Sequence, residues 1–270
     1  MKLIGVGDNT IDDYKHLRTL FPGGNALNVA VYAAKLGCET AYLGVFGSDA
    51  AADHMQKTLA GMSVDTSRCC RADGPSGRAS LMIEDGERVF TGSNGGGVRT
   101  GVSMGFIFDD PDYLQSFSIA HTSTYSYMDE HLATLRPLVP LISYDFSDDF
   151  DTEHALSLCQ YVDIAFFSCA DLSEDATKEL LQNAVSCGCT LAVATRGSQE
   201  ALLFNGESWF RQAPKPVTPI DTLGAGDAFI TGFLVSYVGG ADIETALEKA
   251  ARYAVEICLV QGAFGQGLAY

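Results

Sequence analysis

Short apolar runs alternate with amphipathic segments along most of this 270-residue chain. Apolar runs of four to six residues bounded by polar or glycine positions predict buried strands, and apolar positions every three to four residues predict helices. The expected strands are Leu3–Val6, Thr40–Val45, Ile119–Thr122, Leu141–Tyr144, Val162–Phe167 and Thr190–Thr195. The expected helices are Asn25–Lys35, Ala50–Ala60, Asp129–Leu135, Ser173–Cys187, Gly226–Val238 and Ile243–Val260. This alternation predicts one α/β domain over residues 1–270, a doubly wound and mostly parallel sheet with helices on both faces.

Residues 77–91 break the alternation. Arg78–Glu84 and Arg88–Thr91 read as strands, and Asp85-Gly86-Glu87 lies between them. An Asp-Gly pair between two such runs is typical of a tight β-hairpin turn. A hairpin inserted into a doubly wound fold does not fit the parallel sheet, so we expect it outside, together with segments that follow the first strand.

Composition and charge narrow the class of protein. The chain is 47% hydrophobic and 19% charged, which is ordinary for a soluble enzyme, and no apolar run approaches the roughly 18 residues that cross a bilayer. Its net charge of −17 argues against nucleic acids and anionic membranes as partners. The eight cysteines lack a disulfide-like spacing, and neither close pair has a histidine near it, so packing is favoured over metal binding. We expect a cytoplasmic protein.

One stretch carries most of the chemistry, Gly224-Ala225-Gly226-Asp227 before an apolar helix. Residues this small allow successive backbone N–H groups to point at an anion at the helix N-terminus. A carboxylate beside a bound phosphate is electrostatically unfavourable, but it makes sense as a base that takes a proton from an attacking hydroxyl. The alternative is a helix N-cap, because aspartate is common in first turns.

A second group of polar residues follows the first strand. Asp8, Asn9 and Asp12 stand where ligands bind in open α/β sheets, beyond the carboxyl ends of strands. Carboxylates accept hydrogen bonds from sugar hydroxyls, but solvated loop acids would give the same pattern.

Three segments together resemble the ribokinase-type (PfkB) carbohydrate kinases. Asp221-Thr-Leu-Gly-Ala-Gly-Asp-Ala-Phe229 is similar to the C-terminal signature of the family. Gly23-Gly-Asn-Ala-Leu-Asn-Val-Ala30 is similar to its Gly-Gly-x-x-x-Asn-x-Ala motif, and Gly7-Asp-Asn-Thr-Ile-Asp12 ends the first strand as the family does. The three occur in the family order and extend over most of the chain.

The resemblance implies a ribokinase-like fold and an ATP-dependent transfer of the γ-phosphoryl group to a sugar hydroxyl. It assigns Asp227 as the base, with the amides of Gly224, Ala225 and Gly226 stabilising the transferred group. On the sugar side it implies Asp12 with Asp8 and Asn9 near it, a close backbone approach at Gly23 and Gly24, and hydrogen bonds from Asn28. Parts of 8–22 and 77–97 would form a lid over the sugar and offer a homodimer contact through Ala79, Leu81 and Ile83 or the alternate residues.

The nucleotide side is less distinctive. Thr195-Arg196-Gly197-Ser198 follows a strand and resembles the Thr-x-Gly turn with which the family contacts nucleotide, although most such turns bind nothing. The resemblance also places Ala251, Ala254 and residues 262–265 beside the adenine, and a monovalent cation near Asp221 and Leu223.

The magnesium motif departs from the family pattern. The family has Asn-x-x-Glu after a middle strand, whereas this chain has Ser168-Cys169-Ala170-Asp171. Mg²⁺ keeps several waters and needs few carboxylates, so Asp171 and Asp145, which follows another strand, are both candidate ligands.

Other catalytic classes lack their motifs. The sequence has no Gly-x-Ser-x-Gly, Walker or dinucleotide-binding fingerprint, and the five histidines have no metal or triad spacing. His121, at a strand end, is typical of a core histidine. The N-terminal motif, the short chain and the Ser-x-x-Asp replacement resemble the fructoselysine (fructosamine) 6-kinase branch. Ribose, fructose, 2-keto-3-deoxygluconate and nucleosides stay open as substrates, as does an inactive sugar- or nucleotide-binding relative.

Overall fold

The computed structural model describes residues 1–84 and 87–270. Its larger sheet has the strand order β14-β13-β12-β11-β10-β9-β1-β4-β5, with β6 also paired to β4. Eight strands run parallel to one another: β1, β4, β5, β6, β9, β10, β11 and β12. β13 pairs antiparallel with β12, and β14 pairs antiparallel with β13. The strands are β1 Lys2–Gly7, β4 Glu39–Phe46, β5 Val64–Asp65, β6 Cys70–Arg71, β9 Ile119–Ser123, β10 Ile142–Asp145, β11 Ile164–Ser168, β12 Leu191–Arg196, β13 Gln199–Phe204 and β14 Trp209–Gln212.

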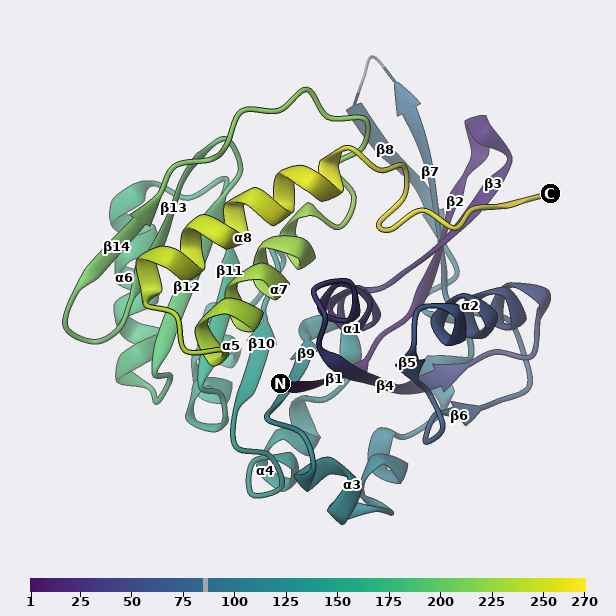
Figure 1. Ribbon diagram of the computed structural model, residues 1–270, viewed down its shortest axis with the longest axis horizontal. Helices are drawn as coiled ribbons and strands as arrows, with labels where there is room; N and C mark the ends of the chain where they lie inside the picture. The colour runs from purple at the N-terminus through teal and green to yellow at the C-terminus, as the bar shows by residue number, and fades with distance from the viewer. Residues whose placement is uncertain (85–86) are drawn as a thin grey trace.

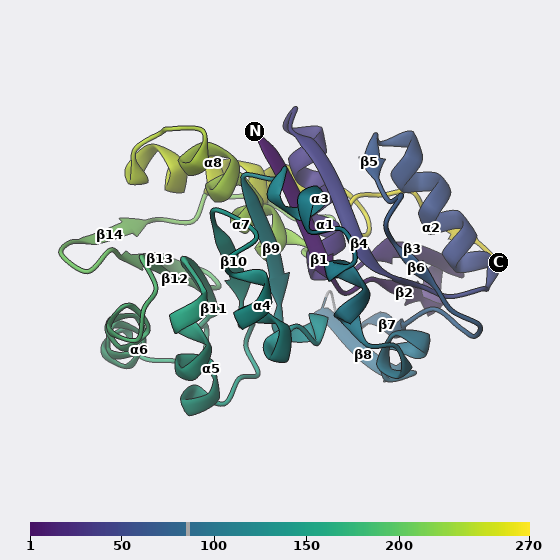
Figure 2. The same ribbon diagram turned by 90° about the horizontal axis from the view of Figure 1, so that it is seen from below.

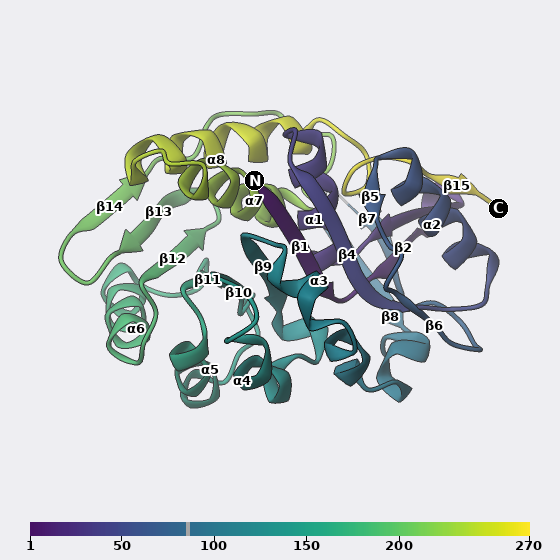
Figure 3. The ribbon, with the colours of Figure 1, turned by 60° about the horizontal axis from the view of Figure 1, so that its bottom comes forward.

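Helices cover both faces of the larger sheet (Figure 3), which confirms the predicted doubly wound arrangement. The α-helices are α1 Asn25–Lys35, α2 Ala50–Gly61, α3 Pro111–Gln115, α4 Leu132–Leu135, α5 Thr152–Leu158, α6 Glu174–Ser186, α7 Ala225–Val238 and α8 Ile243–Cys258. The 3₁₀ helices are η1 Lys15–Leu17, η2 Gly97–Gly101, η3 Met104–Phe108, η4 Thr124–Ser126, η5 Asp129–His131 and η6 Cys159–Tyr161. None of the helices in the described ranges has the length and apolarity needed to cross a membrane.

Alternating side chains of the buried strands pack into hydrophobic clusters on opposite faces of the larger sheet. Phe166 of β11 packs beneath α7, with its ring edge-on to Phe233 and the ring centroids 5.9 Å apart. The next residue, Phe167, joins the core on the opposite face, where Leu181 of α6 lies. Because both faces are covered, the central strands read as continuous apolar runs in the sequence.

A smaller sheet lies to one side of the larger one, far from β13 and β14 (Figures 1 and 2). Its strand order is β15-β3-β2-β7-β8. The strands are β2 Thr10–Tyr14, β3 Thr19–Gly23, β7 Arg78–Glu84, β8 Glu87–Ser93 and β15 Leu268–Ala269. The hairpin expected at 77–91 is therefore confirmed outside the larger sheet, whereas its predicted Asp85-Gly86 turn lies outside the described residues.

The smaller sheet packs against the loop that leads into α7. Tyr14, Phe21 and Leu81 form a small buried cluster with Leu223 packed against it. The Tyr14 hydroxyl donates to the carboxylate of Asp221 in the same loop. The sheet is thus fixed beside the N-terminus of α7, where the candidate base lies.

Candidate active site

Side chains from several elements meet beyond the carboxyl ends of β1 and β10, in a pocket of about 460 Å³. Its lining includes Asp8, Asn9, Asp12, Gly24, Asn25, Asn28, Arg78, Arg99, Tyr125, Asp145, Ser147, Leu223, Gly224 and Asp227. We call this the acidic pocket. It brings together the predicted base and all the predicted sugar-side residues except Gly23, which lies outside the lining.

Asp227 lies in the first turn of α7, but it does not cap that helix. The N-cap is Gly224, and no side chain there bonds the helix start. The carboxylate of Asp227 instead accepts from the side-chain amides of Asn25 at 2.7 Å and Asn28 at 2.6 Å. Burial raises its pKa to about 6, and the negative charge of Asp8 adds to the shift. The capping interpretation is therefore wrong, and the group is poised to exchange a proton near neutral pH.

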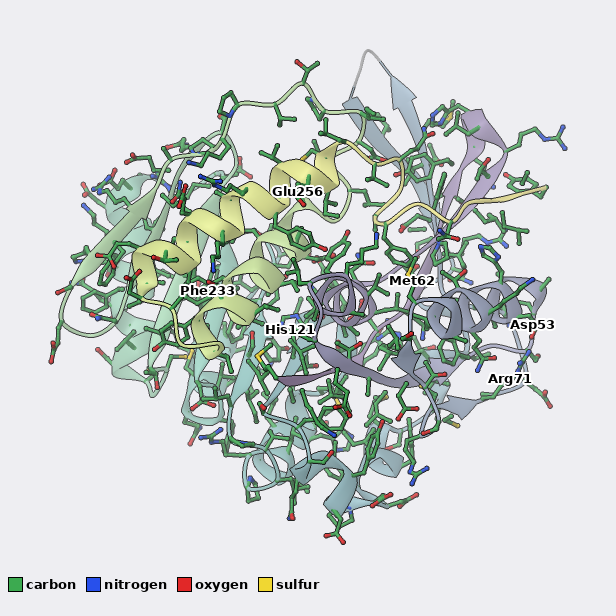
Figure 4. All side chains as sticks on the ribbon, in the orientation of Figure 1. Asp53, Met62, Arg71, His121, Phe233 and Glu256 are labelled. Atoms are coloured by element: carbon green, nitrogen blue, oxygen red, sulfur yellow. The ribbon has the colours of Figure 1, made fainter. Side chains whose placement is uncertain are left out.

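Asn25 connects the candidate base to a second carboxylate, a role that the sequence reasoning missed. Its side-chain nitrogen donates to Asp227 and, at 2.8 Å, to Asp145. Its side-chain oxygen lies 2.8 Å from Nε2 of His121, which is fully buried beside α1 in the middle of the molecule (Figure 4). The other ring nitrogen of His121 lies 3.0 Å from the Ser143 hydroxyl.

This chain of contacts fixes the proton positions. Burial lowers the pKa of His121 to about 3, so the ring is neutral and donates one N–H. Two carboxylates accept from the side-chain nitrogen of Asn25, so its oxygen faces His121 and the ring N–H is assigned to Nε2. His121 is a satisfied core histidine, as the sequence suggested, and it also orients Asn25.

Asp145 is buried at the end of β10, with 8% of its surface exposed. Burial raises its pKa to about 7, and the charges of Asp227 and Asp8 act in the same direction. In the described part of the chain, no group of three or more His, Cys, Asp or Glu residues is arranged to hold a metal. Mg²⁺ takes one or two carboxylates and otherwise phosphate and water oxygens, so a lone acid such as Asp145 fits it.

Asp8 holds the N-terminus of α1. Its two carboxylate oxygens accept from the backbone N–H groups of Asn25 at 2.6 Å and Ala26 at 3.1 Å. The hydroxyls of Ser126 at 2.8 Å and Ser123 at 3.1 Å also donate to it. An anion is stabilised by such donors at a helix start, so Asp8 lines the pocket while it anchors the helix that carries Asn25.

The side-chain amide nitrogen of Asn9 also donates its hydrogen bonds to protein acceptors. Its amide nitrogen donates to the Tyr42 hydroxyl at 2.8 Å and to the carbonyl of Val45 at 2.9 Å. Asn9 is buried and ties the end of β1 to β4. The sugar-side prediction for it stays a prediction.

The remaining sugar-side residues lie against one another. Asp12, on β2, is 5% exposed, and a Cβ atom added at Gly23 would lie 2.3 Å from its carboxylate oxygen. Gly24 has a φ of +113°, and a Cβ there would lie 2.6 Å from the Cα of Asn9. The two glycines thus allow β3 to pass beside the pocket before α1 begins.

Asn28 has one oxygen without a protein partner. Its Oδ1 is buried and accepts no hydrogen bond in the described structure, while its nitrogen donates to Asp227. Buried polar atoms are nearly always satisfied, so this acceptor in the pocket suits a ligand hydroxyl.

A second pocket, of about 350 Å³, lies behind the start of α7. Its lining includes Gly197, Ala225, Gly226 and Ala254 among the predicted nucleotide residues. Thr195 and Ser198 flank the same turn but do not line it, and the Thr195 carbonyl accepts from the backbone N–H of Cys169 at 2.8 Å. We call this the apolar pocket.

The segment 224–227 separates the two pockets. Gly224 and Asp227 line the acidic pocket, whereas Ala225 and Gly226 line the apolar one. Gly224 has a φ of +77°, and a Cβ there would lie 2.3 Å from the Tyr32 hydroxyl. The Ala225 N–H donates to the Thr222 carbonyl at 3.2 Å, and the later N–H groups of the first turn lack intrahelical acceptors.

Asp171 lies apart from the candidate base. It is exposed and lines a third pocket with Ser168 and Asp148. A Cβ atom at Gly197 would lie 3.6 Å from Ala170, so the Ser-x-x-Asp turn is next to the predicted nucleotide turn. Asp171 therefore stays a candidate for the nucleotide side, while Asp145 is the candidate beside Asp227.

Asp221 has its oxygens directed at protein donors. It accepts from the N–H groups of Leu223 and Gly262, each at 3.0 Å, and from Tyr14. These bonds link three segments that border the start of α7. The monovalent-cation site expected near Asp221 and Leu223 stays a prediction.

Two pockets that meet at a glycine-rich helix start suit a phosphotransferase for small molecules. Residues 3–265 match the pfkB family carbohydrate kinase, and the chain belongs to this family. It is therefore an ATP-dependent sugar kinase, a phosphotransferase with an alcohol group as acceptor.

Relatives of similar sequence support the same class, and solved structures support the fold. The chain is 42% identical to fructosamine kinase FrlD of Bacillus subtilis, over all of this chain and 95% of that protein. It is 32% identical to fructoselysine 6-kinase of Escherichia coli, over 97% of this chain and 99% of the other. Among solved structures, the fructokinase of Xylella fastidiosa with bound ATP superposes with a TM-score of 0.83 at 18% identity, covering 98% of this chain and 94% of that one. The fructokinase of Vibrio cholerae, bound to fructose, ADP and calcium, has a TM-score of 0.77 at 22% identity, with 98% and 95% covered.

Proposed function

We propose that this kinase transfers the γ-phosphoryl group of ATP to the 6-hydroxyl of a fructosamine such as fructoselysine. The observation that carries the transfer itself is the segment 224–227, which faces the acidic pocket on one side and the apolar pocket on the other. A sugar in the first and a nucleotide in the second would meet at the start of α7. The fructosamine assignment rests on the relative that is 42% identical over the whole chain.

The residues of the pocket suit this reaction. Asp227 would take the proton of the attacking hydroxyl, with Asn25 and Asn28 holding its carboxylate in place. The free Oδ1 of Asn28 and the carboxylate of Asp12 would accept hydrogen bonds from other sugar hydroxyls. N–H groups of the first turn of α7 would face the transferred phosphoryl group. Bound Mg²⁺ supplies screening of the phosphate charge, and Asp145 would hold it.

A coupled assay of ADP release tests the proposal. Fructoselysine, fructose, ribose and 2-keto-3-deoxygluconate are compared by kcat/KM, and we expect fructoselysine to exceed fructose by ten- to a hundredfold, the value of about one charge-assisted contact. If fructose or ribose has the same kcat/KM as fructoselysine, the fructosamine assignment is wrong and only the assignment as a sugar kinase holds. Absence of turnover with every sugar would favour an inactive relative.

The role of Asp227 is tested with a matched aspartate. Asp227→Asn should lower kcat by at least about 100-fold while nucleotide affinity stays within a few-fold, since proton removal is lost and the amide cradle is kept. Asp242 also begins a helix, and its carboxylate accepts from the N–H of Thr245, so Asp242→Asn is the control that should keep full activity. Because the base must be ionised, kcat/KM should rise with pH through about 6.

We also propose a homodimer contact through the smaller sheet. Leu81 is fully buried against Tyr14 and Phe21 of its own subunit, so the face that carries Leu81 is not available to a partner. The alternate face of the hairpin presents Val89, with 39% of its surface exposed. A hydrodynamic mass equal to that of one subunit would show that no dimer forms. If a dimer forms, Val89→Asp should dissociate it.

A further inference from the structure

Arg99 is a buried cation that forms no ion pair with any described residue. It lies in η2, is 9% exposed and lines the acidic pocket. Among the described residues, no carboxylate lies within 4.0 Å of its guanidinium group, and its Nε has no hydrogen-bond acceptor. Its protein contacts are neutral: one nitrogen donates to the carbonyl of Tyr125, and the group lies over the ring of Tyr127 at 4.5 Å. Buried charges are normally paired, so this position calls for an anion from outside the chain.

The second arginine of the pocket shows the contrast. Arg78, on β7, has its guanidinium 3.6 Å from the carboxylate of Asp13, and 41% of its side chain is exposed. Its charge is thus both paired and solvated. Of the two cations that line the acidic pocket, Arg99 is the one that makes no direct ion pair with a described residue.

Gly96 approaches Arg99 closely without covering it by a side chain. A Cβ atom at Gly96 would lie only 3.2 Å from Nη2 of Arg99, and both residues line the acidic pocket. The planar guanidinium group binds carboxylates with two parallel hydrogen bonds, and both Nε and Nη2 belong to the edge that makes such a pair.

We propose that Arg99 binds the carboxylate of the amino-acid part of the substrate, which makes it a specificity-determining residue. This inference rests on the proposed function, because an amino-acid-linked ketose carries a carboxylate and fructose does not. The pocket has four carboxylates, on Asp8, Asp12, Asp145 and Asp227, against two guanidinium groups. Such an excess of acid repels a dianionic phosphate, but it accepts a substrate whose amine is positive and whose carboxylate reaches Arg99. A sugar phosphate is the other source of an anion here, and the experiment includes it.

The test uses two pairs of substrates that differ by the carboxylate alone. Fructoselysine is compared with the fructose adduct of 1,5-diaminopentane, and fructosylvaline is compared with the fructose adduct of isobutylamine. A third pair, fructose 1-phosphate and fructose, differs by a phosphate group. With the unmodified enzyme we expect kcat/KM to be about 10- to 100-fold higher for the carboxylate member of at least one fructosamine pair. Arg99→Gln should abolish that preference through the sugar KM, with the ATP KM unchanged, and Arg99→Lys should keep part of it. Arg78→Gln is the matched control and should keep the preference.

The outcomes separate the two proposals. If no fructosamine is phosphorylated, the proposed function fails and this inference fails with it. Turnover of fructosamines without any carboxylate preference, or a preference that Arg99→Gln retains, overturns the inference alone. A preference for fructose 1-phosphate that depends on Arg99 overturns the carboxylate assignment. Should Arg99→Gln fail to fold, the substrate pairs with the unmodified enzyme and with Arg99→Lys still decide.

Discussion

Asp227→Asn should make the enzyme inactive and more stable at the same time. The pKa of Asp227 is raised from 3.8 to about 6 because the side chain is partly buried and desolvated, and because it lies near Asp8. For a carboxylate, a folded-state pKa above the unfolded value means that the native state binds more protons between these two pH values. The stability of the protein therefore falls as pH rises from about 4 to about 6, and the loss persists above that range.

The magnitude follows from the same values. The gap between 3.8 and about 6 corresponds to about 3 kcal/mol of free energy of unfolding, an upper estimate for the gain on removing the charge. The new amide would meet two donors, from Asn25 and Asn28, and has one oxygen to offer them. Asn28 can turn its amide, because its Oδ1 has no partner to lose, whereas Asn25 is held by His121. We therefore expect a net gain of about 1–3 kcal/mol at pH 8.

The assay is urea unfolding of the protein, without nucleotide or divalent cation, at pH 8 and near pH 4.5. The variant should gain most at pH 8 and about one third as much near pH 4.5, where Asp227 is protonated in the native state but partly ionised in the unfolded chain. Asp242→Asn gives the opposite sign as a control, because hydrogen bonds from Thr245 lower the pKa of Asp242 and its charge stabilises the fold at neutral pH. A variant of Asp227 that is less stable than the unmodified protein at pH 8, or whose gain does not depend on pH, would refute the reasoning.

Substitutions at three further residues test the pocket. Asp12→Ala should raise the sugar KM about tenfold and leave the ATP KM within twofold, as steady-state kinetics would show; equal effects on both would mean that Asp12 is structural. Gly224→Ala should lower the free energy of unfolding by about 1–3 kcal/mol in urea titrations, because the φ of +77° and the Tyr32 hydroxyl at 2.3 Å leave no room for a Cβ; unchanged stability would contradict this geometry. His121→Phe should lower kcat about tenfold by leaving the oxygen of Asn25 without a donor, and His121→Gln should recover part of it; a pure packing role predicts no such recovery.

The central fold could be predicted from the sequence because both of its faces are buried. The expected strand Leu3–Val6 and the helix Asn25–Lys35 correspond closely to β1 and α1, since their apolar patterns follow directly from packing. β13 and β14 were missed. β14 is the edge strand and β13 lies next to it; β13 begins with the exposed Gln199 and Glu200, and β14 has only two apolar residues, so the apolar runs of both strands are short.

Only those residues of the candidate site that belong to a recognisable sequence motif could be predicted. Asp227 and Asn28 were identified, and the structure brings them within hydrogen-bond distance. Asn25 was missed because its role depends on which way its amide faces, and that is set by His121, 96 residues away. An amide directly after Gly23-Gly24, at the start of a helix, was the one signal available. The hydrogen bonds from the start of α1 to Asp8 also could not be predicted from the sequence, because they depend on how β1 and α1 are placed relative to each other.

The hydrogen-bond partners of Asp227 and Asp145 explain how Asp227 can act as a base. In the described part of the chain, no salt bridge reaches Asp227 or Asp145; their partners are amides and a backbone N–H. A lysine or arginine in place of Asn25 would hold Asp227 as firmly, but an adjacent positive charge lowers the pKa of a carboxylate and weakens it as a base. A neutral amide fixes the position of the carboxylate and leaves burial to raise its pKa to about 6, near the pH at which a base is most effective. Among the described residues, no cation forms an ion pair with Asp227, and in the proposal above the charge of Arg99 serves the substrate instead.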